Sequence, residues 1–158
     1  MTEDQKQYMM EAIRLSSEGM KSNDGGPFGC VIVKDGEIIG RGNNKVTSTN
    51  DPTAHAEIIA IRNACDQLHT YELDDCELYT SCEPCPMCLG AIYWAHLKKI
   101  YFACSRFDAS DIGFDDDFIY SELKKGIVDR TIPMEQLLRT EALDVFKEWT
   151  LKEDKTDY

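Results

Sequence analysis

The first predicted element is an amphipathic helix near the start of the chain. Over residues 9–20, mostly apolar positions recur at the three- and four-residue spacing that places side chains on one helical face. The residues on that face are Met9, Ala12, Ile13, Ser16 and Met20. The stretch Gly25-Gly26-Pro27 then breaks the pattern, because glycine and proline both disfavour a helix interior.

A β-hairpin is expected next. Residues 28–33 and 37–41 are predicted strands, and Asp35-Gly36 stands between them. An Asp-Gly pair in this position is a strong hairpin signal, because the favoured two-residue turn needs positive φ at both residues. The polar residues 43–52 are expected to form a loop.

The rest of the chain predicts helices that alternate with strands. Helices are expected at about 54–67 and 86–96, strands at 77–80 and 99–104, and loop and helix beyond. A hairpin followed by such alternation is typical of an α/β sandwich with a mixed sheet. A chain of 158 residues without internal repeats fits one domain that can bury a real core.

The composition favours a folded cytoplasmic protein. Apolar residues make up 42% of the chain, but no uninterrupted apolar run approaches the ~20 residues needed to span a membrane, so no membrane partner is expected. Residues 1–6 are charged and lack an apolar signal core, so secretion is not expected. In such a protein, the crowding of Cys82, Cys85 and Cys88 favours metal binding over a disulfide framework.

The charge balance argues against a nucleic-acid partner. The formal net charge is −12, and the lysines and arginines are interleaved with acidic residues. A protein that grips a nucleic-acid backbone normally presents a basic patch. We therefore expect a small-molecule substrate and no nucleic acid.

Two short motifs indicate the chemistry. The first is His55-Ala56-Glu57, and the second is Pro84-Cys85-Pro86-Met87-Cys88. H-x-E together with P-C-x-x-C is the signature of the zinc nucleobase deaminases. Structural zinc usually has four protein ligands, whereas catalytic zinc keeps one position for water. Three ligands with an acid beside them therefore predict an enzyme.

Helix geometry explains why these residues can form a site. Pro86 is favoured in the first turn of a helix, so Cys85 would lie at the helix start and Cys88 one turn further on the same face. The positive helix end favours the thiolates that zinc needs. With His55 as third ligand, a zinc-bound hydroxide would form at the fourth position. Glu57 could take the water's proton and deliver it to the leaving nitrogen.

Two other interpretations of the cysteines stay open. The spacing of Cys82, Cys85 and Cys88 resembles the first three cysteines of an iron–sulfur-cluster motif, although residues 90–97 contain no further cysteine. Cys82 could also close a structural Cys₃His zinc site, but we favour a role at the end of a strand. The remaining cysteines are expected to be small buried residues, namely Cys30, Cys65, Cys76 and Cys104.

The motifs also carry a family resemblance. The segments concerned are 25–29, 50–57, 79–95, 113–116, 118–120 and 130–133, with the terminal Tyr158. They are similar to the cytidine-deaminase-like superfamily and, within it, to the small bacterial guanine deaminases. The zinc motifs are specific to the superfamily. The resemblance to the guanine deaminases in particular depends on Tyr93-Trp94, Phe114-Asp115-Asp116 and Tyr158.

The resemblance implies a fold, a reaction and a set of site residues. The fold would be a three-layer α/β/α sandwich with a mixed central sheet. The reaction would convert guanine and water to xanthine and ammonia, with one Zn²⁺ per subunit. Zinc would be held by His55, Cys85 and Cys88; the catalytic residues would be Glu57 and Asp116, and the substrate-binding residues Phe28, Asn44, Ala56, Trp94 and Tyr158.

The resemblance further implies a homodimer. A C-terminal arm of about residues 105–158, which carries Asp116 and Tyr158, would be exchanged between the subunits. Three alternative functions stay open at this point. They are deamination of adenosine in tRNA, deamination of cytosine or guanosine, and a non-catalytic module built on a structural zinc.

Overall fold

The computed structural model describes residues 1–157, so Tyr158 lies outside the described residues. The chain divides into two compact units, Met1–Tyr120 and a second unit that starts at Ser121. Both zinc motifs lie in the first unit. The exchange of a C-terminal arm between subunits stays a prediction.

The first unit is built on a four-stranded sheet. Its strands are β1 (Gly29–Lys34), β2 (Glu37–Asn43), β3 (Glu77–Cys82) and β4 (Lys99–Cys104). In space they follow the order β2-β1-β3-β4. Strand β1 pairs antiparallel with β2 and β3, whereas β3 and β4 are parallel. The mixed sheet expected from the sequence is therefore confirmed.

The hairpin turns where the sequence predicted. Asp35 and Gly36 have φ values of 49° and 85°. Positive φ at both turn residues gives the twist that matches the flanking strands, and aspartate and glycine tolerate it better than most residues. The turn therefore sets the register in which Lys34 pairs with Glu37.

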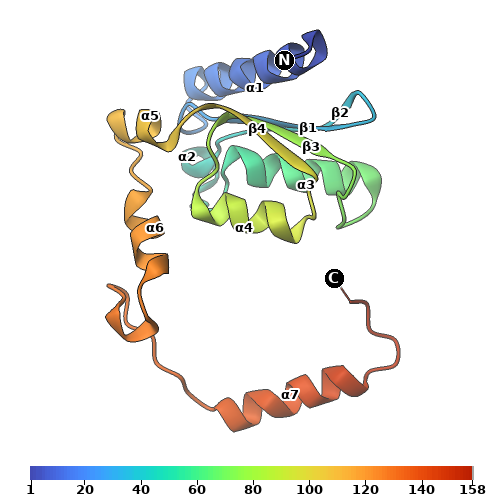
Figure 1. Cartoon of the computed structure of the whole chain (residues 1–158), viewed down its shortest axis with the longest axis vertical. Helices are drawn as coiled ribbons and strands as arrows, with labels where there is room; N and C mark the ends of the chain where they lie inside the picture. The colour runs from blue at the N-terminus through green and yellow to red at the C-terminus, as the bar shows by residue number, and fades with distance from the viewer. Residues whose placement is uncertain (158) are drawn as a thin grey trace. The chain divides into compact units, whose positions relative to one another are not determined.

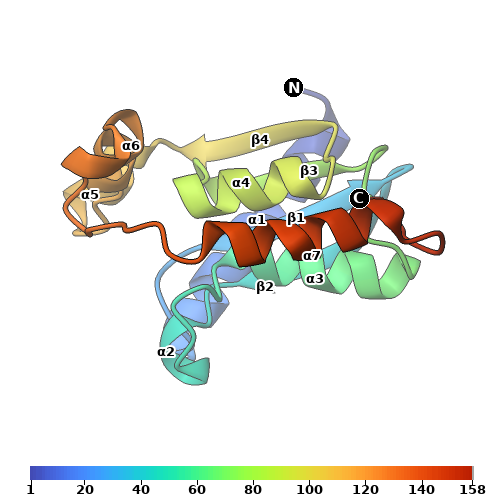
Figure 2. The same ribbon diagram turned by 90° about the horizontal axis from the view of Figure 1, so that it is seen from below.

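Helices cover both faces of this sheet. They are α1 (Glu3–Lys21), α3 (Ala56–Leu68) and α4 (Pro86–Trp94). Figures 1 and 2 show α1 on one face and α3 with α4 on the other. Successive strand residues point to opposite faces, so Ile32 and Leu78 join the core beside α3 and α4, while Val31 and Tyr79 join the core beside α1. The three-layer α/β/α arrangement is confirmed.

Two glycines of β2 allow α3 to lie close to the sheet. A Cβ at Gly42 would fall 2.1 Å from the carbonyl oxygen of Ala56, and a Cβ at Gly40 would fall 2.4 Å from that of Ala60. Neither distance leaves room for a side chain. Close contact between the backbones of β2 and α3 thus helps to position the start of α3, where His55 lies.

Helix α1 turns a different face to the sheet from the one predicted. Ala12 is buried as expected, but Gly19 is the other buried residue, whereas Ile13 and Met20 are exposed. The reason is the close approach of α1 to β1, where a Cβ at Gly29 would lie 2.2 Å from the carbonyl oxygen of Ala12. Small residues therefore occupy this contact, and the larger apolar residues are displaced to its edges.

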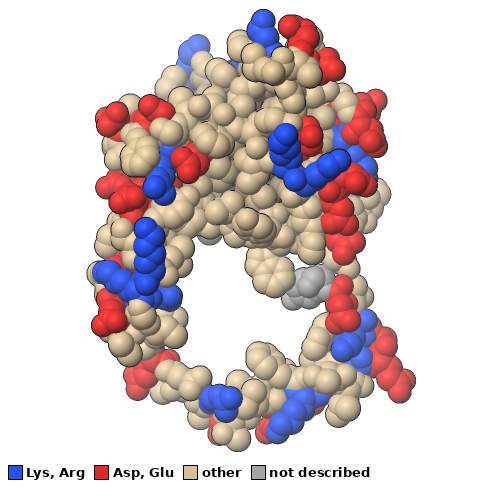
Figure 3. Space-filling model, viewed as in Figure 1, with Lys and Arg blue, Asp and Glu red and all other residues tan. Residues whose placement is uncertain are grey.

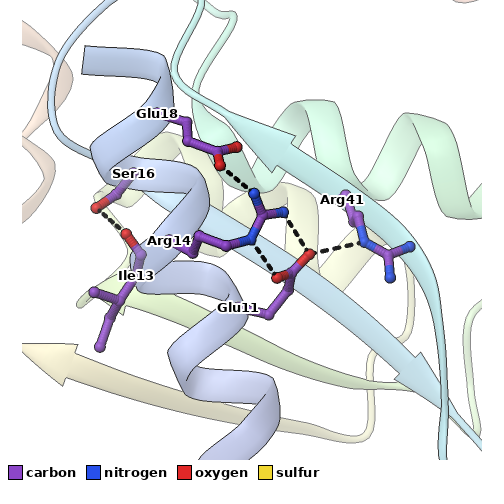
Figure 4. A network of polar contacts seen from close by, with 6 residues as sticks. All are labelled: Glu11, Ile13, Arg14, Ser16, Glu18 and Arg41. Atoms are coloured by element: carbon purple, nitrogen blue, oxygen red, sulfur yellow. Dashed lines mark hydrogen bonds and ion pairs between the residues drawn. The ribbon is translucent and has the colours of Figure 1, made fainter. Parts of the chain in front are cut away.

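A polar network joins α1 to β2 (Figure 4). The Nε and Nη2 atoms of Arg14 donate to the Glu11 carboxylate at 2.7 and 2.9 Å, and the Nε atom of Arg41 donates to it at 3.1 Å. Arg14 also bonds to Glu18. The hydrogen bonds from Arg14 and Arg41 lower the pKa of Glu11 to about 2, against the opposing effect of its burial.

Three short helices join the main elements. They are α2 (Val46–Thr49), α5 (Arg106–Asp111) and α6 (Asp117–Lys124). Helix α2 lies inside the stretch expected to be a loop, and Asn50 ends it with a φ of 53°. Helix α6 contains the boundary between the two units.

The cysteines outside the motifs do not all have the predicted environment. Cys30 and Cys76 are buried, but Cys65 is only half-buried and Cys104 is exposed. Strand β4 is an edge strand of the sheet. A residue at the end of an edge strand lacks a neighbour on one side, so the apolar sequence around Cys104 did not place it in a core.

The second unit contains little buried structure. It comprises the end of α6, a 3₁₀ turn (Ile127–Asp129) and α7 (Arg139–Leu151), in which no residue is buried. Within residues 1–157, no helix combines the length and the apolar character needed to cross a membrane. On the face shown in Figure 3, acidic and basic side chains lie interleaved, as the sequence suggested.

Candidate active site

Three metal-binding side chains meet at the starts of two helices. His55 is the N-cap residue of α3, and Cys85 is the N-cap residue of α4, with Pro86 in the first turn. Cys88 follows on α4 and is fully buried. Helices α3 and α4 pack on the same face of the sheet and contact each other, which brings their first residues together.

The distances in this group fit a tetrahedral zinc ion. The Nδ1 atom of His55 lies 3.6 Å from the Sγ atom of Cys85 and 3.5 Å from that of Cys88. A tetrahedral ion with bonds of about 2.1 Å to nitrogen and about 2.3 Å to sulfur separates these atoms by about 3.6 Å. The imidazole nitrogen and the two sulfurs are therefore spaced as three ligands of a tetrahedral zinc ion would be.

The charges of the two thiols also fit a divalent cation. A hydrogen bond from Cys88, helped by His55, lowers the pKa of Cys85 to about 4. The same hydrogen bond, together with burial, raises the pKa of Cys88. The pair thus holds one negative charge readily and resists a second. A divalent cation between the sulfurs stabilises both thiolates, because its charge offsets their repulsion.

Cys82 lies outside this ligand group. Its thiol donates to the carbonyl oxygen of Ser105 at 3.5 Å, and burial raises the pKa of Cys82 to about 12. The Sγ atom of Cys82 is not among the donor atoms that lie within 4.8 Å of one another at this site. In the described part of the chain, the group that could hold a metal consists of His55, Cys85 and Cys88.

Glu57 lies buried directly beside the ligands. Its Oε2 atom accepts from the thiol of Cys88 at 3.4 Å, and its Oε1 atom accepts from the hydroxyl of Thr80 at 3.3 Å. Burial raises the pKa of Glu57, and the negative charge of Cys85 raises it further. A carboxyl group whose pKa is raised holds a proton more readily than an ordinary carboxyl group, which suits a group that must both take up and release a proton.

A cavity of about 660 Å³ opens onto this group. Its size falls in the range of about 300–1,000 Å³ that small-molecule sites usually have. It is lined by Met20, Asn23, Gly25, Gly26, Phe28, Asn44, Val46, Thr47, Pro52, His55, Glu57, Cys82, Glu83, Cys85, Arg106, Ala109, Phe114, Asp115 and Asp116. Most of the predicted site residues are thus in one cavity.

Asn44 is held in one orientation at the cavity wall. Its Oδ1 atom accepts from the backbone N–H groups of Gly26 at 3.3 Å and Val46 at 3.2 Å. Backbone N–H groups are donors only, so they must face the amide oxygen rather than the amide nitrogen. The NH₂ half of Asn44 is therefore the part that can bind a ligand, as a donor.

Two aromatic rings form an apolar wall of the cavity. Phe28 and Phe114 lie 4.9 Å apart between ring centroids, at an interplanar angle of 87°. Such an edge-to-face pair is a favoured aromatic geometry. A Cβ at Gly26 would lie 2.9 Å from Phe114 and 3.0 Å from Phe28, so this glycine leaves the space that both rings use.

Asp116 brings a second carboxylate to the cavity. It is half-buried, and burial together with the negative charge of Cys85 raises the pKa of Asp116. Arg106, which also lines the cavity, acts in the opposite direction. The cavity therefore contains two carboxyl groups with raised pKa, at Glu57 and Asp116, and a cation at Arg106.

Three predicted substrate-binding residues do not line the cavity in the described chain. The side chain of Ala56 is fully buried in the core beside α3 and α4. Trp94 is 69% exposed at the end of α4. Tyr158 lies outside the described residues. A substrate contact of these residues is therefore not part of the geometry described above.

The sequence interpretation missed several residues of the cavity wall. Met20, Glu83 and Arg106 had no predicted role, although they line the cavity. Met20 was expected in the core because it follows the helical period of α1. Phe114 lies in a segment that carries the family resemblance, and this was the only signal for it. The other residues reach the cavity through contacts between distant segments, which a local pattern does not report.

The fold and the ligand group define a zinc-dependent deaminase. Residues 2–104 match the family described as the cytidine and deoxycytidylate deaminase zinc-binding region, and the chain belongs to this family. Within it, the chain is 55% identical to the guanine deaminase of Bacillus subtilis over 151 residues, which cover 96% of this chain and 97% of the relative.

Solved structures give the same result. The X-ray structure of guanine deaminase from Bacillus subtilis matches with a TM-score of 0.95 at 53% identity, over 100% of this chain and 99% of the other. The guanine deaminase of Nitrosomonas europaea matches with a TM-score of 0.66 at 34% identity, over 69% and 63% of the two chains. The predicted family resemblance is confirmed.

The similarity to another branch of the family is shorter. The tRNA-specific adenosine deaminase of Aquifex aeolicus is 41% identical over 99 residues, which cover 62% of this chain and 65% of the relative. That match covers less than two thirds of this chain, whereas the match to the Bacillus subtilis enzyme covers nearly all of it.

Proposed function

We propose that this protein catalyses the hydrolytic deamination of guanine to xanthine and ammonia. The observation that carries the proposal is the meeting of His55, Cys85 and Cys88 with the buried Glu57 beside the 660 Å³ cavity. The 55% identity to a guanine deaminase over 96% of the chain supports guanine as the substrate.

The three ligands would hold a zinc ion beside the cavity. Bound zinc supplies Lewis acidity, which makes hydroxide available at neutral pH. The protein's own contribution is to bring two thiolates and an imidazole together on rigid helix starts. Because the ligands lie at the first turns of α3 and α4, their positions depend on helix packing rather than on a loop.

Glu57 would move the protons of the reaction. Its carboxylate takes a proton from the attacking water as the oxygen bonds to C2 of guanine, and the electron pair of the C2–N3 double bond moves to N3. Glu57 delivers this proton to N3. Glu57 then carries the proton of the C2 hydroxyl to the exocyclic nitrogen, the C–N bond breaks, ammonia leaves and the C2 carbonyl of xanthine forms. The hydroxyl of Thr80 holds one oxygen of Glu57, and the other oxygen lies beside Cys88, where it is available for proton transfer.

The cavity wall would orient the purine. The NH₂ group of Asn44 donates to an acceptor of the base, since its oxygen is already bonded to two backbone N–H groups. Phe28 and Phe114 offer an apolar surface for the flat ring. Asp116 accepts hydrogen bonds from N–H groups of guanine or assists the leaving amine.

A substrate panel tests this function. Ammonia release is measured from guanine, guanosine, cytosine and an RNA hairpin that carries adenosine. We expect turnover of guanine in preference to the other three. Preferred turnover of the RNA would instead indicate a tRNA adenosine deaminase. If none of the four substrates released ammonia, the proposed deaminase activity would be wrong.

A conservative substitution tests the role of Glu57 within that function. Glu57→Gln keeps the size and polarity of the side chain but removes the titratable group. We expect the variant to retain its zinc, measured by metal analysis, and to lose turnover by roughly a hundredfold or more. Wild-type turnover in Glu57→Gln would show that another group moves the proton.

We further propose a cytoplasmic homodimer with one zinc ion per subunit. Free cysteines throughout the chain fit a reducing compartment. Apolar side chains exposed on α7, at Val145, Phe146 and Trp149, are surface that a second subunit could cover. Ala56, Trp94 and Tyr158 are proposed as further substrate contacts. Light scattering tests the homodimer, and metal analysis tests the ratio of one zinc ion per subunit. An increased Michaelis constant for guanine in a Trp94→Ala variant would support the substrate contact.

A further inference from the structure

The two residues before Cys85 are held by α5 and α6. The backbone N–H of Arg106 donates to the carboxylate of Glu83 at 3.0 Å, and the hydroxyl of Tyr120 donates to the carbonyl oxygen of Pro84 at 3.1 Å. The guanidinium of Arg106 lies over the ring of Tyr120, 4.7 Å from its centroid. These contacts join α5, α6 and the metal-binding loop into one connected group.

Tyr120 lies in the first turn of α6, and Asp116 directly precedes this helix. The backbone N–H of Tyr120 donates to the carbonyl oxygen of Asp116 at 3.3 Å, and residues four apart on a helix are neighbours. Both residues are half-buried, whereas the three residues between them are exposed. The bond of Tyr120 to Pro84 therefore anchors α6 one helical turn from Asp116, which lines the cavity.

We propose that Tyr120 is a positioning residue, which holds Asp116 in place beside the metal-binding loop through its bond to Pro84 and its stacking with Arg106. The inference rests on the proposed deaminase function, because it assigns Asp116 to the substrate cavity. Tyr120 is not among the cavity-lining residues of the described chain, so it acts through Asp116 rather than on the substrate.

The charges around Asp116 agree with this role. Asp116 interacts electrostatically with Cys85 and with Arg106 and Glu83, all of which belong to the same connected group or to the ligand set. A displacement of α6 would change all three interactions at once. Loss of the Tyr120 hydroxyl should therefore change the electrostatic surroundings of Asp116, although Tyr120 itself does not line the cavity.

The first test does not depend on the reaction. Tyr120→Phe removes the hydroxyl and keeps the ring on which Arg106 stacks. We expect the amide protons of residues 119 and 120, which bond to the Asp116 carbonyl, to exchange with solvent roughly tenfold faster. The amides of α3 should be unaffected. Unchanged exchange at the start of α6 would overturn the inference.

The second test is a double-mutant cycle with Asp116→Asn. In the wild-type background, Tyr120→Phe should lower kcat/KM for guanine by roughly tenfold while the zinc content stays constant. In the Asp116→Asn background, the same change should have no further effect, because the residue that Tyr120 positions is already lost. If the two losses multiply, Tyr120 acts independently of Asp116 and the inference is wrong.

Tyr8→Phe is the matched control. The hydroxyl of Tyr8 donates to the backbone carbonyl of Gly36 at 2.8 Å, which is the same kind of bond at the hairpin turn. This variant should leave kcat/KM unchanged. A wild-type protein that does not deaminate guanine would reject the proposed function, while the exchange measurement would still decide whether Tyr120 anchors α6.

Discussion

Thr80, in strand β3, donates its hydroxyl to the carboxylate of Glu57 at 3.3 Å. Both side chains are buried. A buried acceptor that loses its donor costs about 1–3 kcal/mol. The bond therefore couples the middle layer of the fold to the proposed proton carrier, and it fixes one oxygen of Glu57 while the other faces Cys88.

Removal of this hydroxyl should impair both stability and turnover. We expect Thr80→Val to lower kcat/KM by roughly tenfold and the melting temperature by a few degrees, because Glu57 loses its donor and its fixed orientation. Thr80→Ser keeps the hydroxyl and should stay near wild type in turnover. Steady-state kinetics and calorimetry check both variants, and a fully active Thr80→Val would mean that Glu57 is oriented by its other contacts.

Substitution of Cys85 should remove the zinc, whereas substitution of Cys82 should not. Cys85→Ser should reduce zinc content to a small fraction of one ion per chain, because a serine hydroxyl is a much weaker zinc ligand than a thiolate. Cys82→Ser should retain the zinc, since Cys82 bonds to Ser105 and lies outside the ligand group. Metal analysis after dialysis decides this, and loss of zinc from Cys82→Ser would favour a four-ligand structural site.

Removal of the metal should also destabilise the fold. Zinc binds the folded chain but meets no preformed site in the unfolded chain, so its release removes binding free energy from folding. We expect a chelator to lower the melting temperature by roughly 5 °C or more. Re-addition of zinc should restore it, and a chelator-insensitive melting temperature would contradict a metal held by His55, Cys85 and Cys88.

Gly25 should be essential for the orientation of Asn44. A Cβ at Gly25 would lie 2.0 Å from the Oδ1 atom of Asn44, so Gly25→Ala must displace the amide from the cavity wall. We expect its Michaelis constant for guanine to rise roughly tenfold or more. Gly90→Ala is the control, because a Cβ there would meet no described atom within 4 Å beyond its chain neighbours and the adjacent backbone of its own helix. Equal Michaelis constants of the two variants would show that the orientation of Asn44 does not contribute to guanine binding.

The Glu11 network should contribute a pH-dependent part of the stability. The folded-state pKa of Glu11 is about 2, below its ordinary value of 4.5. A lowered pKa stabilises the fold above about pH 4.5, and this contribution is lost as the pH falls toward 2. Because Arg14 is about half exposed, we expect only about 0.5–1 kcal/mol.

Glu11→Gln isolates this contribution. The variant should be less stable than wild type at pH 7 and approach it near pH 2, in urea unfolding measured at several pH values. Lys6, whose ion pair with Glu3 lies exposed on the same helix, offers the control Lys6→Gln, which should change little. A constant difference between Glu11→Gln and wild type across pH would show that packing rather than charge is lost.

Much of the fold could be predicted because its signals are local. The turn at Asp35-Gly36, the break after α1 and the start of α4 at Pro86 each depend on a few adjacent residues. The predicted face of α1 was partly wrong for the opposite reason. Which side of a helix meets the sheet depends on the space at Gly29, a residue outside the helix.

The amino-acid sequence by itself determined the donor atoms of the metal site, because spacing along a helix places Cys85 and Cys88 within one turn and brings Glu57 two residues from His55. Only the tertiary structure decided that the oxygen of Asn44 is already bonded, that Phe114 and Arg106 line the cavity and that Tyr120 bonds to Pro84. These features join segments far apart in the chain. Their geometry depends on how the sheet and its helices pack, and no local pattern contains that information.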